Sequence, residues 1–356
     1  MTSSVRPPIV RRGLEALRAY RDVGHEAAID LSDNTCRFGV PPAAEDVLRA
    51  FTTGRFAPYP SAANDALRTA LGSVLGVDPE GIVTGCGSDD VLDAALRAFG
   101  EPGQRIAFPA PTFVMLGHFA TANGLVPVPV PPRADGAIDL DALLATGADH
   151  VYLCSPNNPT GETLPAGALE RVLEATTGLV ILDEAYIEFA GGSEVARAAT
   201  HGRLLVARTL SKAHALAGLR VGYGIATPTM VNAIERARGP YRVSALSEAI
   251  AIAVVTRDAE WVREHVAQAN AMRDRFTSAL RSLGFAPRSS AANFVLLPTR
   301  DALALERALR EDGIAVRVFR ELPGVGDALR ITVAPWDVLA RVLAVLERTV
   351  RRERRP

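Results

Sequence analysis

The sequence predicts an α/β protein with a mostly parallel sheet of about seven strands, sandwiched by helices, and a smaller α+β domain at its C-terminal end. Short apolar runs alternate with amphipathic stretches between about residues 80 and 230. Several of these runs are apolar on both faces, which is typical of strands covered by helices on each side. After residue 239 the pattern changes to long helical stretches with a few short strands.

The strands of the predicted sheet are seven apolar runs bounded by turn residues. They cover residues 81–84, 105–108, 125–130, 150–154, 179–182, 204–207 and 220–225. Helical periodicity lies between most of them, for example at residues 89–99 and 165–175. This alternation indicates strands joined by helical crossovers, which is how parallel sheets are connected.

The C-terminal third of the chain has its own order of elements. We expect helices at 247–256 and 260–283, a strand at 294–297, a helix at 303–311, strands at 314–318 and 329–333, and a helix at 338–351. We therefore divide the chain into an N-terminal segment (1–45), a large domain (46–240) and a small α+β domain (241–356). The N-terminal segment lacks periodic structure, so we expect it to pack on the small domain or on a partner subunit.

Composition excludes several classes of function. The chain has 356 residues, of which 48% are hydrophobic and 22% charged, and its net charge of −1 offers no positive surplus for nucleic acid or acidic membranes. The N-terminus has no apolar targeting segment, and no apolar run approaches the ~20 residues of a membrane span. Cys36, Cys86 and Cys154 form neither a disulfide framework nor a zinc pattern. We expect a soluble cytoplasmic protein without a metal, nucleic-acid or membrane partner.

Lys212 is the only lysine among the 39 lysine and arginine residues. An arginine stays protonated in proteins, whereas a lysine can lose its proton and attack a carbonyl as a neutral amine. Lys212 also follows the predicted strand at 204–207, and ligands of α/β sheets bind at the carboxyl ends of the strands. The sequence therefore indicates that Lys212 is a nucleophile.

Three other predicted strands also end in polar motifs. Residues 85–90 read Gly-Cys-Gly-Ser-Asp-Asp, residues 155–161 read Ser-Pro-Asn-Asn-Pro-Thr-Gly, and residues 183–186 read Asp-Glu-Ala-Tyr. Each alone is also typical of a turn, a helix N-cap or a paired surface acid. Together they suit pyridoxal phosphate, which needs a Schiff-base lysine, an acid for its ring nitrogen and a phosphate cradle.

These motifs, with residues 183–189 and 208–222 read in full, resemble the pyridoxal-phosphate aminotransferases of fold type I (class I/II). Among these they are most similar to the histidinol-phosphate aminotransferase family, and the similarity extends from about residue 20 to the last helix. The resemblance implies that Lys212 binds the cofactor and moves a proton between Cα and C4′. It also implies that Asp183 pairs with the ring nitrogen, and that Asn158 and Tyr186 hydrogen-bond the ring oxygen O3′.

The resemblance implies further contacts for the cofactor, which fall on seven residues. The phosphate would be bound by backbone N–H groups of Ser88 and Asp89, by the hydroxyls of Thr209 and Ser211, and by Arg220. Phe113 would stack on the ring, and Tyr59 would reach the phosphate in the neighbouring subunit, which implies a homodimer.

Three residues match substrate-binding positions of the family. Arg330 matches the arginine that binds the substrate carboxylate through a planar two-pronged contact. Histidinol phosphate has no α-carboxylate, so Arg330 would face its phosphate and the carboxylate of glutamate in turn. Arg317 and Tyr20 match positions that contact the distal phosphate of histidinol phosphate.

The expected function is transfer of an amino group between histidinol phosphate, or a related aromatic or imidazole amino compound, and 2-oxoglutarate, in histidine biosynthesis. Two alternatives stay open: an aromatic amino acid aminotransferase, and a decarboxylase of a phosphorylated amino acid on the same scaffold. The family usually has Gly-Thr-Arg-Glu-Glu after the Arg330 strand, where this chain has residues 334–337, Ala-Pro-Trp-Asp. That departure leaves the amino donor open. A regulator with an aminotransferase-like sensor domain would need a DNA-binding module, for which the roughly 45 residues before the core are too short.

Overall fold

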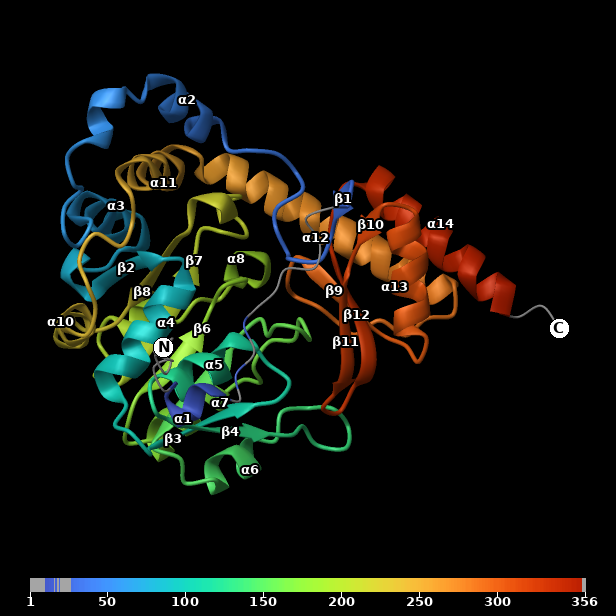
Figure 1. Cartoon of the computed structure of the whole chain (residues 1–356), viewed down its shortest axis with the longest axis horizontal. Coiled ribbons are helices and arrows are strands. Elements are labelled where there is room, and N and C mark those ends of the chain that lie inside the picture. The colour runs from blue at the N-terminus through green and yellow to red at the C-terminus, as the bar shows by residue number, and fades with distance from the viewer. Residues whose placement is uncertain (1–9, 16, 18, 20–26, 354–356) are drawn as a thin grey trace, which may run out of the picture.

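The computed structural model describes residues 10–15, 17, 19 and 27–353. Its largest element is a seven-stranded sheet in the order β2-β8-β7-β6-β5-β3-β4, with β8 antiparallel to both neighbours and the other adjacent pairs parallel (Figure 1). In that order the strands are Ile82–Cys86, Val221–Ile225, Leu204–Thr209, Val180–Asp183, His150–Cys154, Arg105–Pro109 and Val126–Val130. All seven predicted strands are therefore present, and the predicted mostly parallel α/β sheet is confirmed.

Helices cover both faces of this sheet. One face packs against α4 (Ser88–Phe99), α5 (Met115–Ala122) and α10 (Pro228–Arg236). The core on the other face includes side chains of six helices, of which α2 packs on α11: α2 (Pro42–Ala50), α3 (Asp65–Leu75), α6 (Leu140–Ala145), α7 (Ala168–Ala175), α9 (Val195–Ala198) and α11 (Ala245–Arg257). The shorter elements are α1 (Arg12–Glu15), α8 (Ile187–Ala190) and the 3₁₀ helices η1 (Thr53–Phe56), η2 (Pro79–Gly81) and η3 (Ala217–Leu219).

Alternating side chains of each strand enter the two cores. On β6, Val180 and Leu182 lie in the core with α7 and α11, whereas Ile181 lies in the core with α4 and α5. Because successive side chains of a strand point to opposite faces, Asp183 belongs to the α4 face, together with Tyr152 of β5. This parity places the polar strand ends on one side of the sheet.

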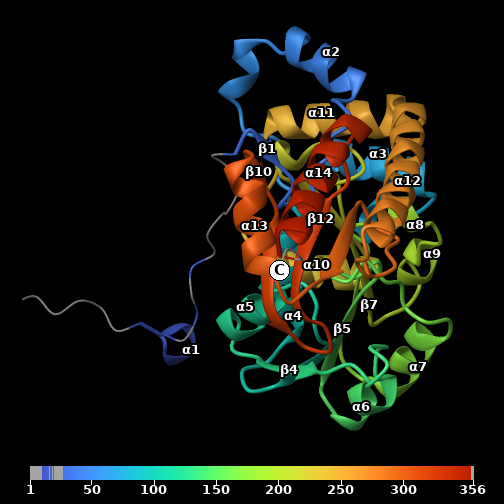
Figure 2. The ribbon, with the colours of Figure 1, turned by 90° about the vertical axis from the view of Figure 1, so that its right-hand side faces the viewer.

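The C-terminal part is a separate three-stranded antiparallel sheet in the order β11-β12-β9, with three helices (Figures 1 and 2). Its elements are α12 (Ala259–Ser282), β9 (Phe294–Pro298), α13 (Ala302–Glu311), β10 (Ile314–Ala315), β11 (Arg317–Leu322), β12 (Gly326–Thr332) and α14 (Trp336–Glu353). Side chains of α12, α13, α14 and this sheet share one apolar core.

The single strand predicted at 314–318 is wrong, because the structure divides this stretch between two sheets. Residues Ile314 and Ala315 of β10 pair in parallel with β1 (Ile29–Asp30), and β11 begins at Arg317 to pair with β12. The partner of β10 comes from the N-terminal part of the chain, more than 280 residues away. Local periodicity carries no information about such a distant pairing.

The division of the chain at residues 45 and 240 remains a proposal. Helix α11 follows residue 240, yet its Ile250 and Val254 belong to the core beneath α2 and α3. Further along, Phe276 and Leu280 of α12 belong to the C-terminal core. This packing favours a boundary within α12. No helix in the described part of the chain is long and apolar enough to cross a membrane.

Candidate active site

The polar motifs converge at the carboxyl edge of the large sheet. Asp183 ends β6, Asn158 lies in the loop after β5, and Lys212 lies three residues after β7. Helix α4 begins at Ser88, directly after β2, which runs in the same direction as β7 because both are antiparallel to β8. Four separate stretches of sequence therefore reach one edge of the sheet, as predicted.

Lys212 is half-buried, and its Nζ donates a hydrogen bond to the carbonyl oxygen of Asp33 at 2.9 Å. Burial lowers the pKa of the amine to about 8, and the charges of Arg330 and Arg220 contribute, while the carboxylates of Asp33 and Asp89 oppose the shift. A lysine with this pKa is partly neutral near physiological pH. It can therefore act as a nucleophile or a base there.

Asp183 is 4% exposed, and both of its carboxylate oxygens accept hydrogen bonds. Oδ2 accepts from the hydroxyl of Tyr152 at 2.8 Å, and Oδ1 accepts from the backbone N–H of Ala185 at 3.0 Å. Burial raises the pKa of the carboxyl to about 6, and these hydrogen bonds oppose the rise. A buried carboxylate of this kind is suited to a protonated ring nitrogen, because a cationic partner offsets the loss of hydration.

Tyr186 lies beside Lys212, with the amine 5.9 Å from the centre of the phenol ring. Its hydroxyl accepts a hydrogen bond from the side-chain amide of Asn34 at 2.9 Å. The ring packs edge-on against Phe294 of β9, at 5.2 Å between centroids. Burial raises the pKa of the Tyr186 hydroxyl, so it is protonated at neutral pH.

Arg330 reaches the same site from β12 and is 7% exposed. Its Nη1 donates to the side-chain oxygen of Asn158, and its Nη2 donates to the carbonyl oxygen of Ser32 at 2.6 Å. The guanidinium lies over the ring of Phe319, 5.7 Å from its centroid. Arg317 is half-buried and occupies the position directly opposite Arg330 on β11.

Residues 32–34 connect Arg330 of β12 to Lys212 and Tyr186 at the edge of the large sheet, a role that the sequence did not indicate. Ser32 contacts Arg330, Asp33 contacts Lys212 and Asn34 contacts Tyr186. Asn34 is 1% exposed, and its backbone N–H donates to the hydroxyl of Thr332 at 3.0 Å. In the sequence this stretch is polar and lacks helical or strand periodicity, which is the signal that could have indicated this role.

The turn between β2 and α4 has the shape of an anion cradle. Gly87, with φ of +79°, precedes the first helical residue Ser88, so the first N–H groups of α4 stay available to a ligand. A side chain at Gly87 would lie 2.4 Å from Arg220 Nη2, and one at Gly222 would lie 2.1 Å from the backbone N of Ser88. Arg220 therefore lies directly against the turn, where it also contacts Asp89 at 3.3 Å.

Two buried hydroxyls lie at the end of β7, which is separated from β2 and this turn by the single strand β8. The Thr209 hydroxyl donates to Ser211 Oγ at 2.9 Å and accepts from the Ser211 backbone N–H at 3.1 Å. Thr209 pairs in register with Gly222, which in turn pairs with Gly85 on β2. The hydroxyls and the turn therefore lie at neighbouring positions across three strands.

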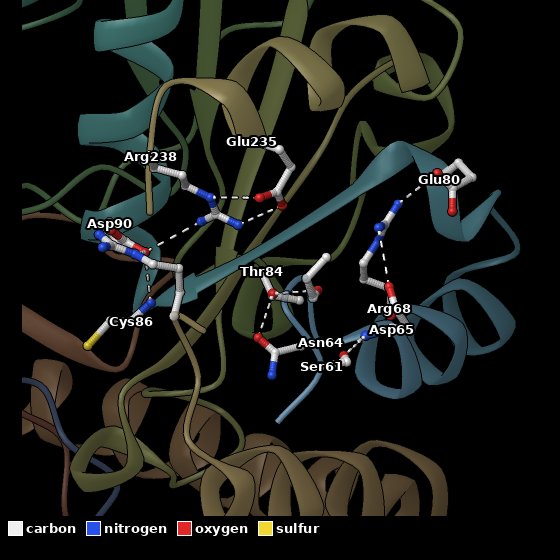
Figure 3. Close-up of polar contacts among 12 residues, drawn as sticks. Ser61, Asn64, Asp65, Arg68, Glu80, Thr84, Cys86, Asp90, Glu235 and Arg238 are labelled. Atoms are coloured by element: carbon white, nitrogen blue, oxygen red, sulfur yellow. Dashed lines mark hydrogen bonds and ion pairs between the residues drawn. The ribbon is translucent and has the colours of Figure 1, made fainter. Parts of the chain in front are cut away.

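Asp90, the last residue of the polar motif at 85–90, holds the cradle in place, a role that the sequence did not indicate. Its carboxylate accepts from the backbone N–H of Cys86 at 3.1 Å and pairs with Arg238 (Figure 3). It also pairs with Arg242. Arg238, whose side chain is 1% exposed, also pairs with Glu235 at 2.7 Å. A buried carboxylate with two cationic partners fixes the Gly-rich turn at the base of α4.

Two of the remaining predicted residues, Phe113 and Tyr59, lie in the described part of the chain. Phe113 is half-buried against the core that contains α4 and α5. Tyr59 is 80% exposed and stacks on Tyr241 at 4.7 Å between ring centroids. Tyr20 lies outside the described residues. In the segment that departs from the family pattern, Trp336 begins α14 and contacts Arg275 of α12, so its ring serves packing between helices.

These residues fit pyridoxal phosphate. A lysine amine with a lowered pKa, a buried carboxylate with a raised pKa and a cradle of helix N–H groups, hydroxyls and Arg220 correspond to the three needs of that cofactor. In the described part of the chain, no group of three or more histidine, cysteine or acidic side chains could hold a metal ion.

Comparison with known proteins gives consistent matches along nearly the whole chain. A family model described as aminotransferase class I and II matches residues 26–345. The chain is 36% identical to histidinol-phosphate aminotransferase of Roseobacter denitrificans, over 98% of this chain and 99% of that one. It is 32% identical to histidinol-phosphate aminotransferase 1 of Nostoc sp., covering 91% and 93%.

A solved structure matches the fold over nearly the whole chain. The structure is histidinol-phosphate aminotransferase of Sinorhizobium meliloti in complex with pyridoxal 5′-phosphate. Its TM-score is 0.85, with 28% identity over 96% of this chain and 97% of that one.

Proposed function

The chain belongs to the aminotransferase class I and II family, and on this premise we propose that it transfers an amino group between histidinol phosphate, or a related imidazole or aromatic amino compound, and 2-oxoglutarate. The reaction is a step of histidine biosynthesis. The observation that carries the proposal is the convergence of the Lys212 amine and the buried Asp183 carboxylate at the ends of neighbouring strands.

Pyridoxal phosphate is the cofactor, and when bound it withdraws electrons from the substrate Cα so that the Cα proton becomes acidic. Lys212 would hold the cofactor through its amine, and the free amine would carry a proton between the substrate Cα and C4′. Its lowered pKa of about 8 suits both steps, because the same group must give and accept a proton near neutral pH.

Asp183 and Tyr186 set the electronic state of the site. We assign to the Asp183 carboxylate the protonated ring nitrogen, since a buried anion needs a cationic or hydrogen-bonding partner. The Tyr186 hydroxyl is protonated and can donate to the ring oxygen O3′, with Asn158 as a second donor from its amide.

The phosphate site follows from the geometry of the cradle. Ser88 and Asp89 offer backbone N–H groups at the start of α4, and Arg220 adds a permanent positive charge. The hydroxyls of Thr209 and Ser211 provide further donors. Binding of a dianionic phosphate here would compete with the Asp89 carboxylate for Arg220, so we expect the Asp89–Arg220 contact to loosen in the loaded enzyme.

The substrate side carries two arginines. Arg330 is buried and presents a planar guanidinium, which suits a carboxylate or phosphate, and Arg317 lies opposite it. An aromatic amino acid offers this pair one carboxylate, whereas a phosphate is a dianion that both arginines can contact. The second arginine therefore supports histidinol phosphate over an aromatic amino acid as the amino donor.

We also propose that the protein is a homodimer in which Tyr59 reaches the cofactor phosphate of the neighbouring subunit. The exposed Tyr59–Tyr241 stack supports this, because a large exposed aromatic pair is unusual outside an interface. A subunit-mixing experiment tests it. Hybrids of Lys212→Ala and Tyr59→Ala subunits should contain one site with both changes and one intact site, and so recover tight cofactor binding in that site.

If Tyr59 instead serves its own subunit, every hybrid site keeps one defect, and mixing restores nothing. Sedimentation of each variant alone provides the control, since both must assemble like the parent protein for the mixing result to be informative.

A half-reaction tests the proposed chemistry. L-Glutamate added to the loaded enzyme should convert the absorbance of the bound cofactor to that of its amine form, and histidinol phosphate should do so faster than phenylalanine or tyrosine. Faster conversion by the aromatic amino acids would favour the aromatic alternative. Release of carbon dioxide without conversion by any amino donor would replace the transaminase proposal with the decarboxylase.

A further inference from the structure

We propose that Tyr152 is a positioning residue for Asp183. The Tyr152 hydroxyl donates to one oxygen of the Asp183 carboxylate, which keeps that carboxylate ionised and directed toward the cofactor ring. The proposal rests on the proposed function for the identity of the group that Asp183 faces. The role of the Tyr152 hydroxyl is testable without any substrate.

The contact is short and fully enclosed. Tyr152 Oη donates to Asp183 Oδ2 at 2.8 Å, and the two residues are 0% and 4% exposed. The residues lie on the adjacent parallel strands β5 and β6, where Tyr152 pairs with Ile181 and Asp183 pairs with Cys154. The tyrosine therefore reaches diagonally along one face of the sheet to the last residue of the next strand.

Apart from Asp183 and the Cys154 thiol, the surroundings of the phenol are apolar. Tyr152 lies in the core formed with α4, α5 and α10, among side chains such as Ile106, Leu116 and Ile181. A hydroxyl has a single proton to donate, and in this core Tyr152 gives it to a carboxylate. A hydrogen bond from a neutral donor to an ionised acceptor is stronger than one between neutral groups, and it is stronger still where water is excluded.

The two donors to Asp183 act on different oxygens. Tyr152 occupies Oδ2 from the neighbouring strand, and the Ala185 N–H occupies Oδ1 from the following turn. Two donors on two oxygens fix the plane of the carboxylate, and each oxygen retains one acceptor site. Both donors favour the charged form and oppose the burial that raises the pKa of Asp183 to about 6.

The other titratable groups facing Asp183 cannot replace this donor. Asp89 and Glu184 add negative charge, which raises the pKa of Asp183 further. The Cys154 thiol and the Tyr186 hydroxyl are both buried, and burial raises the pKa of each. Cys154 donates to the carbonyl oxygen of Pro156, and Tyr186 accepts from Asn34. Tyr152 is therefore the side chain that counteracts the burial of Asp183.

The test compares the apo-enzyme with its Tyr152→Phe variant. Aspartate carboxyl carbons are labelled with carbon-13 and titrated by NMR, and Asp183 is assigned by the signal that Asp183→Asn removes. Loss of a charge-assisted hydrogen bond should raise the pKa of Asp183 by about 1 or more. The matched control is Tyr223→Phe, which removes the hydroxyl of another buried tyrosine, on β8 and on the opposite face of the sheet, and should leave that pKa unchanged.

Cofactor affinity provides the second measurement. At pH 7 the Tyr152→Phe variant should bind pyridoxal phosphate about tenfold more weakly, because a protonated Asp183 cannot pair with a ring cation, and the deficit should shrink above pH 8. If Tyr152 only fills the core, the variant will lose stability but show the parent titration of Asp183 and the parent pH profile of binding. That result would overturn the proposal whatever the enzyme's substrate is.

If Tyr152→Phe does not fold, a second variant allows the effect of the hydroxyl on the pKa of Asp183 to be measured. Fluorotyrosine incorporated at position 152 retains the ring shape and makes the hydroxyl a stronger donor. The pKa of Asp183 should then fall. An unchanged Asp183 titration in the fluorotyrosine protein would also contradict the positioning role.

Discussion

Arg317 and Arg330 lie directly opposite each other on the antiparallel strands β11 and β12, so both side chains leave the same face of the three-stranded sheet. Like charges in this arrangement repel each other, and the repulsion is relieved by an anion placed between them. Arg330 donates a hydrogen bond to Asn158, and its positive charge helps to lower the pKa of Lys212. The face on which the two arginines meet is therefore the side from which an anionic substrate approaches.

The pair predicts a substrate-dependent effect of Arg317→Gln. KM for histidinol phosphate should rise by about 10- to 100-fold, because a dianion loses one of its two cationic partners, whereas KM for glutamate should change by less than about threefold. Steady-state kinetics with each substrate measures this. Arg320→Gln, an exposed arginine on the same strand, is the matched control. Equal increases of KM for both substrates would remove Arg317 from the phosphate site.

Replacing Lys212 by arginine should abolish turnover without unfolding the protein. Arginine keeps the positive charge and can still donate to the carbonyl oxygen of Asp33, but it cannot supply a neutral amine. We expect kcat to fall by at least about 10²- to 10⁴-fold, the usual contribution of a general acid/base. Borohydride treatment followed by mass spectrometry should find no cofactor attached to the variant. Retained turnover would show that another group does this chemistry.

Attachment of the cofactor to the apo-enzyme should depend on pH through Lys212. Burial lowers the pKa of this amine to about 8, so its neutral fraction rises about tenfold per pH unit below pH 8 and levels off above it. The rate of attachment should follow the same curve in a buffer free of phosphate, which would compete for the cradle. A rate that is flat between pH 6 and 8 would show that removal of the Lys212 proton does not limit attachment.

Stability should decrease as the pH falls, in part because of His265. This histidine on α12 is 3% exposed, its ring lies 4.3 Å from that of Trp261, and burial lowers its pKa. Below the unfolded pKa of about 6.5 the unfolded chain binds a proton that the folded chain does not. The free energy of unfolding should therefore fall by up to about 1.4 kcal/mol per pH unit as the pH decreases.

The variant His265→Phe should weaken this pH dependence, and chemical denaturation between pH 5 and 7.5 measures it. His201→Gln, a half-buried histidine in a turn, is the control. If His265→Phe leaves the slope of stability against pH unchanged, His265 does not titrate on unfolding.

The sequence allowed the large sheet to be predicted because its central strands are buried on both faces. Runs such as Val180–Asp183 are continuously apolar up to their last residue, and turn residues bound them. The same reasoning failed at Ile314–Ala315, where a two-residue strand takes a partner from residues 29–30. Pairing of that kind depends on tertiary packing, and local pattern does not encode it.

Some residues of the active site could likewise be predicted from the sequence, and others could not. Lys212, Asp183 and Arg220 could be located because reactive residue types stand at strand ends, where the fold gathers ligands. Tyr152 could not, because a tyrosine inside an apolar strand has the pattern of an ordinary core residue. Asn34 lies in a stretch without periodicity, so its contact with Tyr186 emerges only from the tertiary structure.

The attachment of residues 31–34 to β12 has a consequence for the order of assembly during synthesis. The large sheet is complete once residue 225 has left the ribosome, so Lys212 and Asp183 can already stand at its edge. Leu31 and Asn34, however, find their partner Thr332 only when the chain is nearly finished. At ~5–20 residues per second, the segment over the reactive amine therefore waits at least ~5 s for its partner. A nascent chain arrested before β12 therefore lacks the strand that holds residues 31–34 over the Lys212 amine.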